Sequence, residues 1–202
     1  MKFIQRWSYG LANGLMLSMN ESHAKRYTYY FGLQVWIGGA VKITVLLLTA
    51  ALLNCLAPAI AIFISFAVLR TYAGGFHMDT YGRCIASSMI LFMASAVFIQ
   101  YEVCHLQTYP LLILAIISAS VSFYCISKYC PVDHKNKPVE DADKPRLKHI
   151  ALTTVAAEFF IAIILLFFRD KLFSLGIIFG IILEISSIIP AGQKFYSRFI
   201  GN

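Results

Sequence analysis

Apolar stretches of membrane-crossing length recur along the chain and restrict its possible folds more than any other feature. Hydrophobic residues make up 59% of the sequence, against about 45–50% in soluble domains. A helix needs about 20 apolar residues to cross a bilayer, and inside the bilayer its backbone polar groups must be satisfied within the protein. A chain of 202 residues leaves no room for a large additional soluble domain. The sequence therefore predicts an all-α, polytopic membrane helix bundle.

The apolar runs and the polar breaks between them divide this single integral-membrane domain into an interfacial region and six spans. The expected segments are an N-terminal amphipathic interfacial helix region (1–33), a first helical hairpin (34–69), a loop of reactive residues (70–84), spans three and four (84–127), a polar loop (128–149), spans five and six (150–190) and a basic tail (191–202). The apolar run of span two, 59–69, is short for a crossing. Its helix is expected to start before Pro58, to continue into Tyr72, or to cross only part of the bilayer.

The first segment has the pattern of a helix that lies in the membrane interface. Large apolar side chains recur at intervals of four, which places them on one helical face: Phe3, Trp7, Leu11 and Leu15. Several aromatic rings in this segment suit the headgroup region. We predict an amphipathic helix on the cytoplasmic leaflet; the alternative is a first helix that only packs on the bundle.

The distribution of positive charge predicts the orientation. Of 17 Lys and Arg, only Arg169 and Lys171 fall on one side of the expected spans, while Lys42 lies within a span. Because cytoplasmic loops carry the excess of Lys and Arg, both termini and the loops 70–84 and 128–149 are expected in the cytoplasm. The same charge, beside apolar runs, favours a membrane surface as partner and not nucleic acid.

The loop 70–84, R-T-Y-A-G-G-F-H-M-D-T-Y-G-R-C, differs in composition from the runs around it. Its reactive or conformationally special residues are Arg70, Gly74, Gly75, His77, Asp79, Arg83 and Cys84. A thiolate favoured by a nearby histidine or cation is a strong nucleophile near neutral pH, and adjacent glycines permit a tight turn and expose N–H groups able to stabilise an oxyanion. Two hypotheses follow: a catalytic His77–Cys84 pair, or a boundary loop with an interfacial histidine and an inert cysteine.

Three ionisable residues within the spans, Lys42, Glu158 and Glu184, are functional candidates because charges in a bilayer are costly. One interpretation is a buried ion pair between Lys42 and Glu158. Another is a small transporter or channel with a polar path lined by all three and a non-catalytic loop as gate; a non-catalytic membrane partner protein is a third. Gly176 and Gly180 form a G-x-x-x-G pattern that permits close helix contact, within the chain or in a homodimer.

The remaining cysteines do not indicate a metal or redox centre. Cys55, Cys104, Cys125 and Cys130 lie in or beside apolar runs, where a free cysteine behaves as a small apolar residue. The spacings contain no C-x-x-C pair, and no convergent ligand set for a metal is visible. The sequence also lacks dinucleotide and P-loop glycine patterns. We therefore expect neither a metal nor a nucleotide cofactor.

The reactive loop resembles the motif of the accessory gene regulator B family, bacterial membrane peptidases that mature quorum-sensing peptides. The matching positions are Arg70, Gly74, Gly75, His77 and Cys84. The later P-V-D-H-K-N-K-P, 131–138, is similar to the Pro- and Lys-containing loop of the family, and length, span number and loop order agree over the whole chain. One departure is that the basic run often found before this second loop is reduced here to K-Y-C at 128–130.

The resemblance implies a membrane cysteine endopeptidase with cyclase activity in a bacterial cell membrane. Its substrate would be a small precursor peptide with an amphipathic N-terminus and an acidic C-terminal tail. Cys84 would attack a peptide bond and His77 would act as base and then as acid; a thioester intermediate would cyclise to a thiolactone or lactone. Arg70 and Arg83 are candidates to contact the tail or the oxyanion, and Asp79 is a candidate to orient His77.

Overall fold

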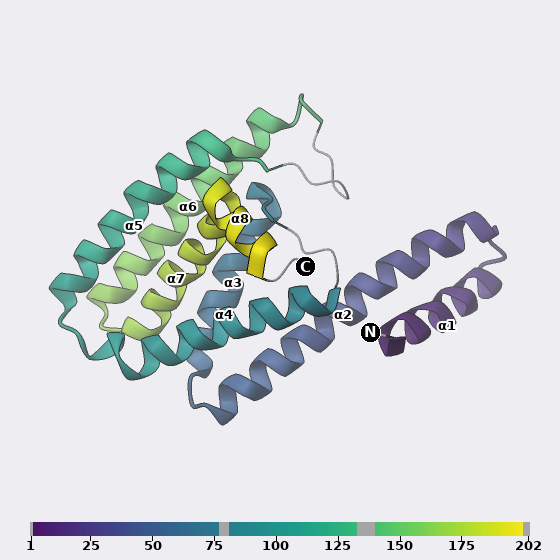
Figure 1. The fold of residues 1–202 in the computed structure, drawn as a ribbon, viewed down its shortest axis with the longest axis horizontal. Helices are drawn as coiled ribbons and strands as arrows, with labels where there is room; N and C mark the ends of the chain where they lie inside the picture. Colours follow the sequence, from purple (N-terminus) through teal and green to yellow (C-terminus); the bar gives the residue numbers. More distant parts are fainter. Residues whose placement is uncertain (1, 77–80, 133–139, 200–202) are drawn as a thin grey trace. The chain divides into compact units, whose positions relative to one another are not determined.

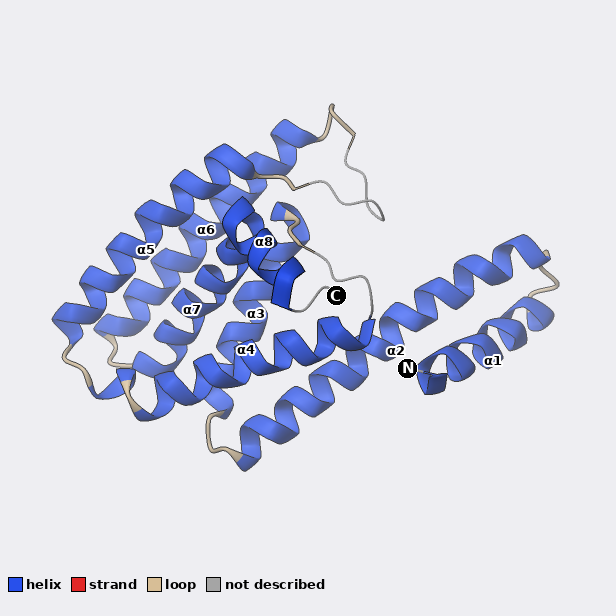
Figure 2. Cartoon of the chain, viewed as in Figure 1, coloured by secondary structure: helices blue, strands red, loops and turns tan. Residues whose placement is uncertain are grey.

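The structure, a computed structural model, describes residues 2–76, 81–132 and 140–199, and these residues are helical apart from short connections (Figures 1 and 2). Within these ranges the elements are α1 (Lys2–Ser18), α2 (His23–Leu52), α3 (Leu56–Ala73), α4 (Tyr81–Tyr101), the short 3-10 helix η1 (Val103–His105), α5 (Thr108–Tyr129), α6 (Lys144–Phe167), α7 (Lys171–Ile188) and α8 (Pro190–Phe199). Helices α2 to α7 are long and apolar enough to cross a membrane. The predicted all-α bundle with six candidate spans is confirmed.

The chain forms two structural units, of which residues 1–48 form the first. In this unit α1 is followed by a turn in which Asn20 has a φ of 50°, and α2 begins at His23. The helix that contains the first predicted span therefore starts well before residue 34. On α1 the predicted apolar stripe is exposed, from 40% at Leu15 to 62% at Phe3, while the neighbouring stripe that contains Ile4, Ala12 and Met16 is buried.

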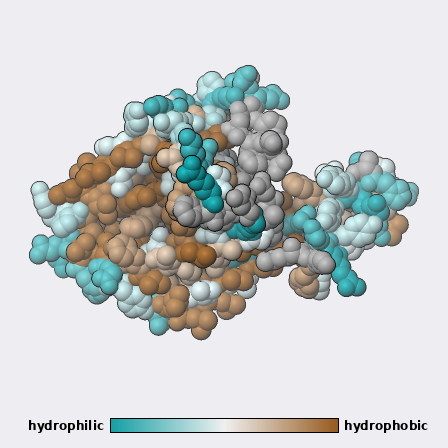
Figure 3. Space-filling model, viewed as in Figure 1, coloured by the Kyte–Doolittle hydropathy of each residue, from teal (hydrophilic) through white to brown (hydrophobic). Residues whose placement is uncertain are grey.

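In the second unit, residues 49–202, α7 is the central helix. It contacts α3, α4, α5, α6 and α8, and it is the most buried of the six candidate spans. On the face seen in Figure 3, the surface over these helices is largely apolar, whereas hydrophilic residues gather toward the ends. Since lipid tails are as apolar as leucine, close packing must hold such helices together.

The G-x-x-x-G pattern lies at the contact between α7 and α3. A Cβ at Gly180 would stand 2.7 Å from the Ile62 carbonyl oxygen, and one at Gly176 would stand 3.0 Å from the Pro58 carbonyl oxygen. A side chain at either position would therefore hold the two helices apart. Of the two alternatives left open by the sequence, the structure shows the contact within the chain.

The sequence predicted that the helix of the short second span starts before Pro58, continues into Tyr72, or crosses only part of the bilayer. In the structure this helix, α3, starts before Pro58 and continues past Tyr72. Proline is tolerated in the first turn of a helix because the N–H groups there have no intrahelical partner. With 18 residues, α3 is about 27 Å long, slightly less than the ~30 Å hydrocarbon thickness. Its C-terminal end, where the reactive loop begins, therefore falls near a membrane boundary.

The end of the chain forms a helix that the sequence did not indicate. The predicted basic tail corresponds mostly to α8, which begins at Pro190 directly after the extended residue Ile189. Pro190 ends α7, as expected, but it also occupies the first position of a new helix, where proline is favoured. Tyr196 on α8 is buried, so this segment packs on the unit.

Candidate functional site

Arg70, in the last turn of α3, reaches across to α7 and meets a buried acid. Its Nη1 donates to Glu184 Oε2 at 3.3 Å and to Ser187 Oγ at 2.6 Å, and the Ser187 hydroxyl donates to Glu184 Oε2 at 3.2 Å. The Glu184 side chain is 0% exposed and that of Arg70 is 18% exposed. An unpaired charge buried in a membrane-spanning bundle is costly. We therefore treat the two residues together as the Arg70–Glu184 pair.

The same guanidinium holds the backbone of the reactive loop. Its Nη2 donates to the Phe76 carbonyl, and the Phe76 N–H donates to the Ser187 carbonyl at 3.1 Å. The backbone of Phe76 is therefore hydrogen-bonded to α7 through its N–H and to Arg70 on α3 through its carbonyl, beside the Arg70–Glu184 pair.

Both glycines of the loop are required by its geometry. Gly74 has a φ of 72° and Gly75 a φ of 135°, a region that L-residues avoid. A Cβ at Gly75 would collide with the Arg70 guanidinium and the Ser187 hydroxyl, and one at Gly74 would stand 2.5 Å from the Val132 carbonyl oxygen. The Gly74 N–H donates to the Arg70 carbonyl at 3.2 Å, so it already has a partner; an oxyanion role for the Gly75 amide stays a prediction.

The start of the polar loop is attached to the reactive loop. The Val132 N–H donates to the Ala73 carbonyl at 2.9 Å, and Val132 and Gly74 form a parallel β-bridge. Cys130, which is buried, directs its thiol toward the same Ala73 carbonyl at 3.7 Å. The two sequence segments that carry the family resemblance therefore meet at the end of α3.

Helix α8 packs against the same loop. The Tyr196 and Phe76 rings stack with centroids 6.1 Å apart and an interplanar angle of 20°. The Tyr196 hydroxyl shares a hydrogen bond of 2.7 Å with Ser186 Oγ on α7. The N–H of Phe76 is thus held by α7 and its ring by α8.

Cys84 lies at the start of α4, as the sequence predicted. It is half-buried in the first turns of that helix, and its neighbour Arg83 is exposed. The Cys84 carbonyl accepts hydrogen bonds from Ser88 Oγ at 2.6 Å and Ser87 Oγ at 3.2 Å, both within α4. His77 and Asp79 lie outside the described residues, so their approach to Cys84 stays a prediction.

The other cysteines are placed differently. All five thiols are free, and Cys55, Cys125 and Cys130 are buried. Burial raises the pKa of the Cys130 thiol to about 11 and also raises that of Cys55. Cys104 is half-buried, but it lies in η1 beyond the opposite end of α4, and the part of α4 that follows Cys84 is about 26 Å long.

The intramembrane acids have different partners. Glu184 pairs with Arg70, whereas Glu158 accepts a hydrogen bond of 2.8 Å from Ser65 Oγ. Glu158 also lines an apolar cavity of about 460 Å³ between α3, α6 and α7. Lys42 belongs to the first unit and Glu158 to the second, so their predicted pairing stays a prediction.

Sequence reasoning singled out Arg70 and Glu184 separately but did not connect them. They are 114 positions apart, and Ser187, which bonds both, was not considered at all. The spacing E-x-x-S at 184–187 within an apolar run was the available signal, because residues three apart share a helical face.

Comparison with known proteins gives a family match over most of the chain. The family model described as Accessory gene regulator B matches residues 5–188. Accessory gene regulator protein B of Staphylococcus aureus (strain Newman) is 27% identical over 172 residues, covering 85% of each chain. That of Staphylococcus intermedius is 25% identical over 181 residues, covering 89% of this chain and 90% of the relative. AgrB-like protein 2 of Clostridium perfringens (strain 13) is 23% identical over 201 residues, covering 95% and 90%. No solved structure matches the chain.

The Arg70–Glu184 pair predicts a non-additive effect on stability. Glu184→Gln leaves a permanently charged guanidinium without its counter-ion, so we expect a loss of about 3–5 kcal/mol in the free energy of unfolding. The double variant Arg70→Met/Glu184→Met, which removes both charges, is expected to lose less than Glu184→Gln alone. Denaturant titration in detergent measures both, with exposed Glu102→Gln as the control; a double variant that loses as much as Glu184→Gln, or more, would contradict the pairing.

The thiol environments predict selective alkylation. At pH 7.5 a thiol with a pKa of about 11 is ionised in roughly one molecule in 3,000, and Cys130 is also only 7% exposed. We expect iodoacetamide to modify Cys84 at least about tenfold faster than Cys130, and the Cys130 rate to rise as pH increases toward 11. Peptide mass spectrometry of the folded protein reads each site. Equal rates at Cys84 and Cys130 in folded protein would contradict the structure.

Proposed function

Because the chain belongs to the accessory gene regulator B family, we propose that it is a membrane cysteine endopeptidase and cyclase that matures a small quorum-sensing peptide. Family membership gives the chain a role in quorum-sensing signal processing, and its six apolar helices fit a multi-pass membrane protein. The covalent chemistry, the site residues and the orientation in the membrane are the content of the proposal.

The proposed reaction has two acyl transfers. His77 accepts the thiol proton of Cys84, and the thiolate attacks a carbonyl carbon of the precursor. The C–N bond breaks, His77 returns the proton to the leaving amine, and the C-terminal tail departs while the fragment remains as a thioester on Cys84. A cysteine or serine within the fragment then attacks the thioester carbonyl and displaces the Cys84 thiolate, which regains a proton. The product is a cyclic thiolactone or lactone.

The observation that carries this proposal is the anchoring of the reactive loop at Phe76. Phe76, the residue directly before His77, is hydrogen-bonded to Ser187 on α7 and to Arg70 on α3, and Cys84 is half-buried in the first turns of α4. Covalent catalysis requires a nucleophile and base in a defined geometry, and a thioester survives for cyclisation only where water is excluded. We assign Arg70 an orienting role, because its donors are engaged by Glu184, Ser187 and Phe76.

Charge supports the proposed substrate and orientation. Arg83 is exposed beside Cys84 and remains our candidate to contact an acidic precursor tail. The predominance of Lys and Arg on one side of the spans supports a cytoplasmic active site with both termini in the cytoplasm. The same positive face would attract a precursor with an acidic tail.

The structure weakens one argument for the alternative function, a small transporter or channel. That hypothesis needed Lys42, Glu158 and Glu184 to line a polar path, but Glu184 is fully buried and paired with Arg70. Glu158 is hydrogen-bonded to Ser65 and borders a mostly apolar cavity. Neither arrangement favours transport over peptide processing.

A covalent-intermediate assay tests the proposal directly. The purified protein in liposomes is incubated with a candidate precursor, and intact-mass spectrometry detects an acyl adduct and the released tail. We expect an adduct on the unchanged protein and on Cys104→Ala, which removes the other half-buried thiol. We expect none on Cys84→Ala, and acylation by His77→Ala slowed about 10²–10⁴-fold.

Two results would contradict the proposed roles of Cys84 and His77. Tail release or normal cyclic peptide production by Cys84→Ala would show that the reaction does not pass through this thiol. An adduct on Cys84 that forms at an unchanged rate in His77→Ala would retain the nucleophile and reject the proposed base.

A further inference from the structure

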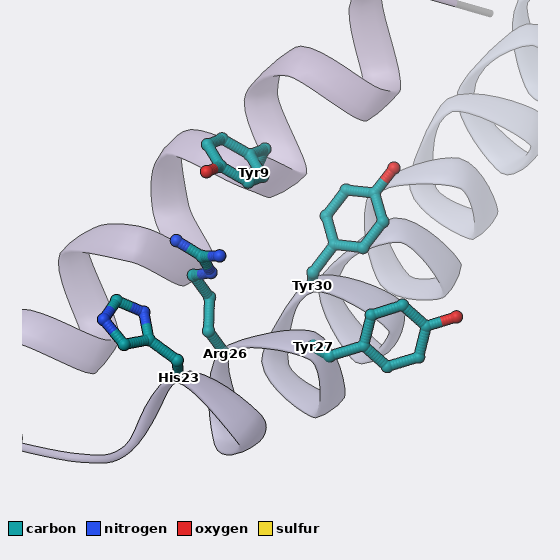
Figure 4. A pocket seen from close by; sticks show the side chains of 5 residues that line it. All are labelled: Tyr9, His23, Arg26, Tyr27 and Tyr30. Carbon is teal, nitrogen blue, oxygen red and sulfur yellow. The ribbon is translucent and has the colours of Figure 1, made fainter.

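The first unit contains a pocket that the proposed reaction does not use. It lies between α1 and the beginning of α2 and has a volume of about 310 Å³. Tyr9 of α1 and four residues of α2, His23, Arg26, Tyr27 and Tyr30, line it (Figure 4). Two side chains that can carry positive charge and three phenol rings therefore surround one small volume at the protein surface.

The side chains in this pocket are arranged around Arg26. Its guanidinium carbon lies 5.3 Å from the centroid of the Tyr9 ring, within the range of a cation–π contact. Figure 4 shows His23 beside Arg26 and the Tyr27 and Tyr30 hydroxyls pointing away from it. The Tyr30 ring meets that of Tyr9 edge-on at 6.3 Å. The pocket thus has a polar side at Arg26 and an aromatic wall opposite.

The nearest acid in the sequence does not neutralise this site. Glu21 forms an ion pair of 2.7 Å with Lys25, the residue next to Arg26. The planar guanidinium of Arg26 is suited to bidentate recognition of phosphate or carboxylate oxygens, and the His23 imidazole and Tyr9 hydroxyl are further hydrogen-bond donors. The charge and the donors indicate an anionic ligand.

The position of the pocket along α2 decides which anion fits best. The apolar span of α2 begins at Lys25, so the four residues of α2 that line the pocket lie in its first turns, where a crossing helix passes the lipid headgroups. On α1 the side chains of Phe3 and Trp7 are 62% and 58% exposed, as expected of a helix anchored in the membrane interface. A phosphate at headgroup depth is the anion most available here.

We propose that this pocket binds the phosphate headgroup of an anionic membrane lipid, with Arg26 as the main contact. The guanidinium and the His23 imidazole bind the phosphate oxygens, and the aromatic wall packs against the glycerol part of the lipid. Such a ligand ties the α1–α2 hairpin to one leaflet. The proposal depends on the geometry of the first unit alone and not on the peptidase reaction.

Adjacent residues on α2 provide a matched test. Arg26→Gln and Lys25→Gln each remove one positive charge at neighbouring positions, but only Arg26 lines the pocket. The full-length protein in detergent is exposed to equal amounts of phosphatidylglycerol and phosphatidylcholine, and native mass spectrometry measures the lipids retained. We expect phosphatidylglycerol preference on the unchanged protein, a roughly tenfold loss in Arg26→Gln, and a change within about twofold in Lys25→Gln.

Further arms identify the ligand and exclude misfolding. Circular dichroism and gel filtration must show that the variants fold. Arg26→Lys keeps the positive charge but loses the planar guanidinium that can bind two phosphate oxygens at once, so it is expected to retain an intermediate amount of lipid. Equal losses in Arg26→Gln and Lys25→Gln would reduce the effect to general attraction and overturn the site. Arg26-dependent binding of glycerol 1-phosphate or an acidic peptide, without phosphatidylglycerol preference, would overturn the lipid assignment.

Discussion

The burial of one charge pair in a protein surrounded by lipid governs the arrangement of the candidate site. Glu184 has no exposed surface and Arg70 little, so each depends on the other for a partner in a medium where ions are poorly solvated. This requirement brings the end of α3 to the end of α7. The remaining donors of Arg70 then hold Ser187 and Phe76, which extends the constraint from two helices to the loop before His77.

Small residues make this arrangement possible. Gly176 and Gly180 let α7 lie against α3, where the packing of apolar side chains alone would not bring backbones so close. Gly75 leaves space for the Arg70 guanidinium, and Gly74 leaves space for the backbone of Val132 beside it. The start of the polar loop and the reactive loop consequently meet at the end of α3.

The sequence was most informative where the relevant signal is local. Apolar runs predicted the six spans, and one loop of 15 residues carried Arg70, the glycines, His77 and Cys84. The Arg70–Glu184 pair could not be predicted in the same way, because the two charges stand 114 positions apart and the sequence offered Lys42 as the intramembrane cation for an ion pair. Helix α8 was not predicted because a proline such as Pro190 is compatible both with the end of one helix and with the first position of the next.

Hydrogen exchange at the Phe76 amide tests most directly whether the Arg70–Glu184 pair holds the reactive loop. This N–H donates to the Ser187 carbonyl, next to the pair, and can be compared between the unchanged protein and Glu184→Gln by mass spectrometry. The account predicts faster exchange at Phe76 in the variant, while the amides of α5 stay protected. Unchanged protection of Phe76 in a folded Glu184→Gln variant would show that the loop is held independently of the pair.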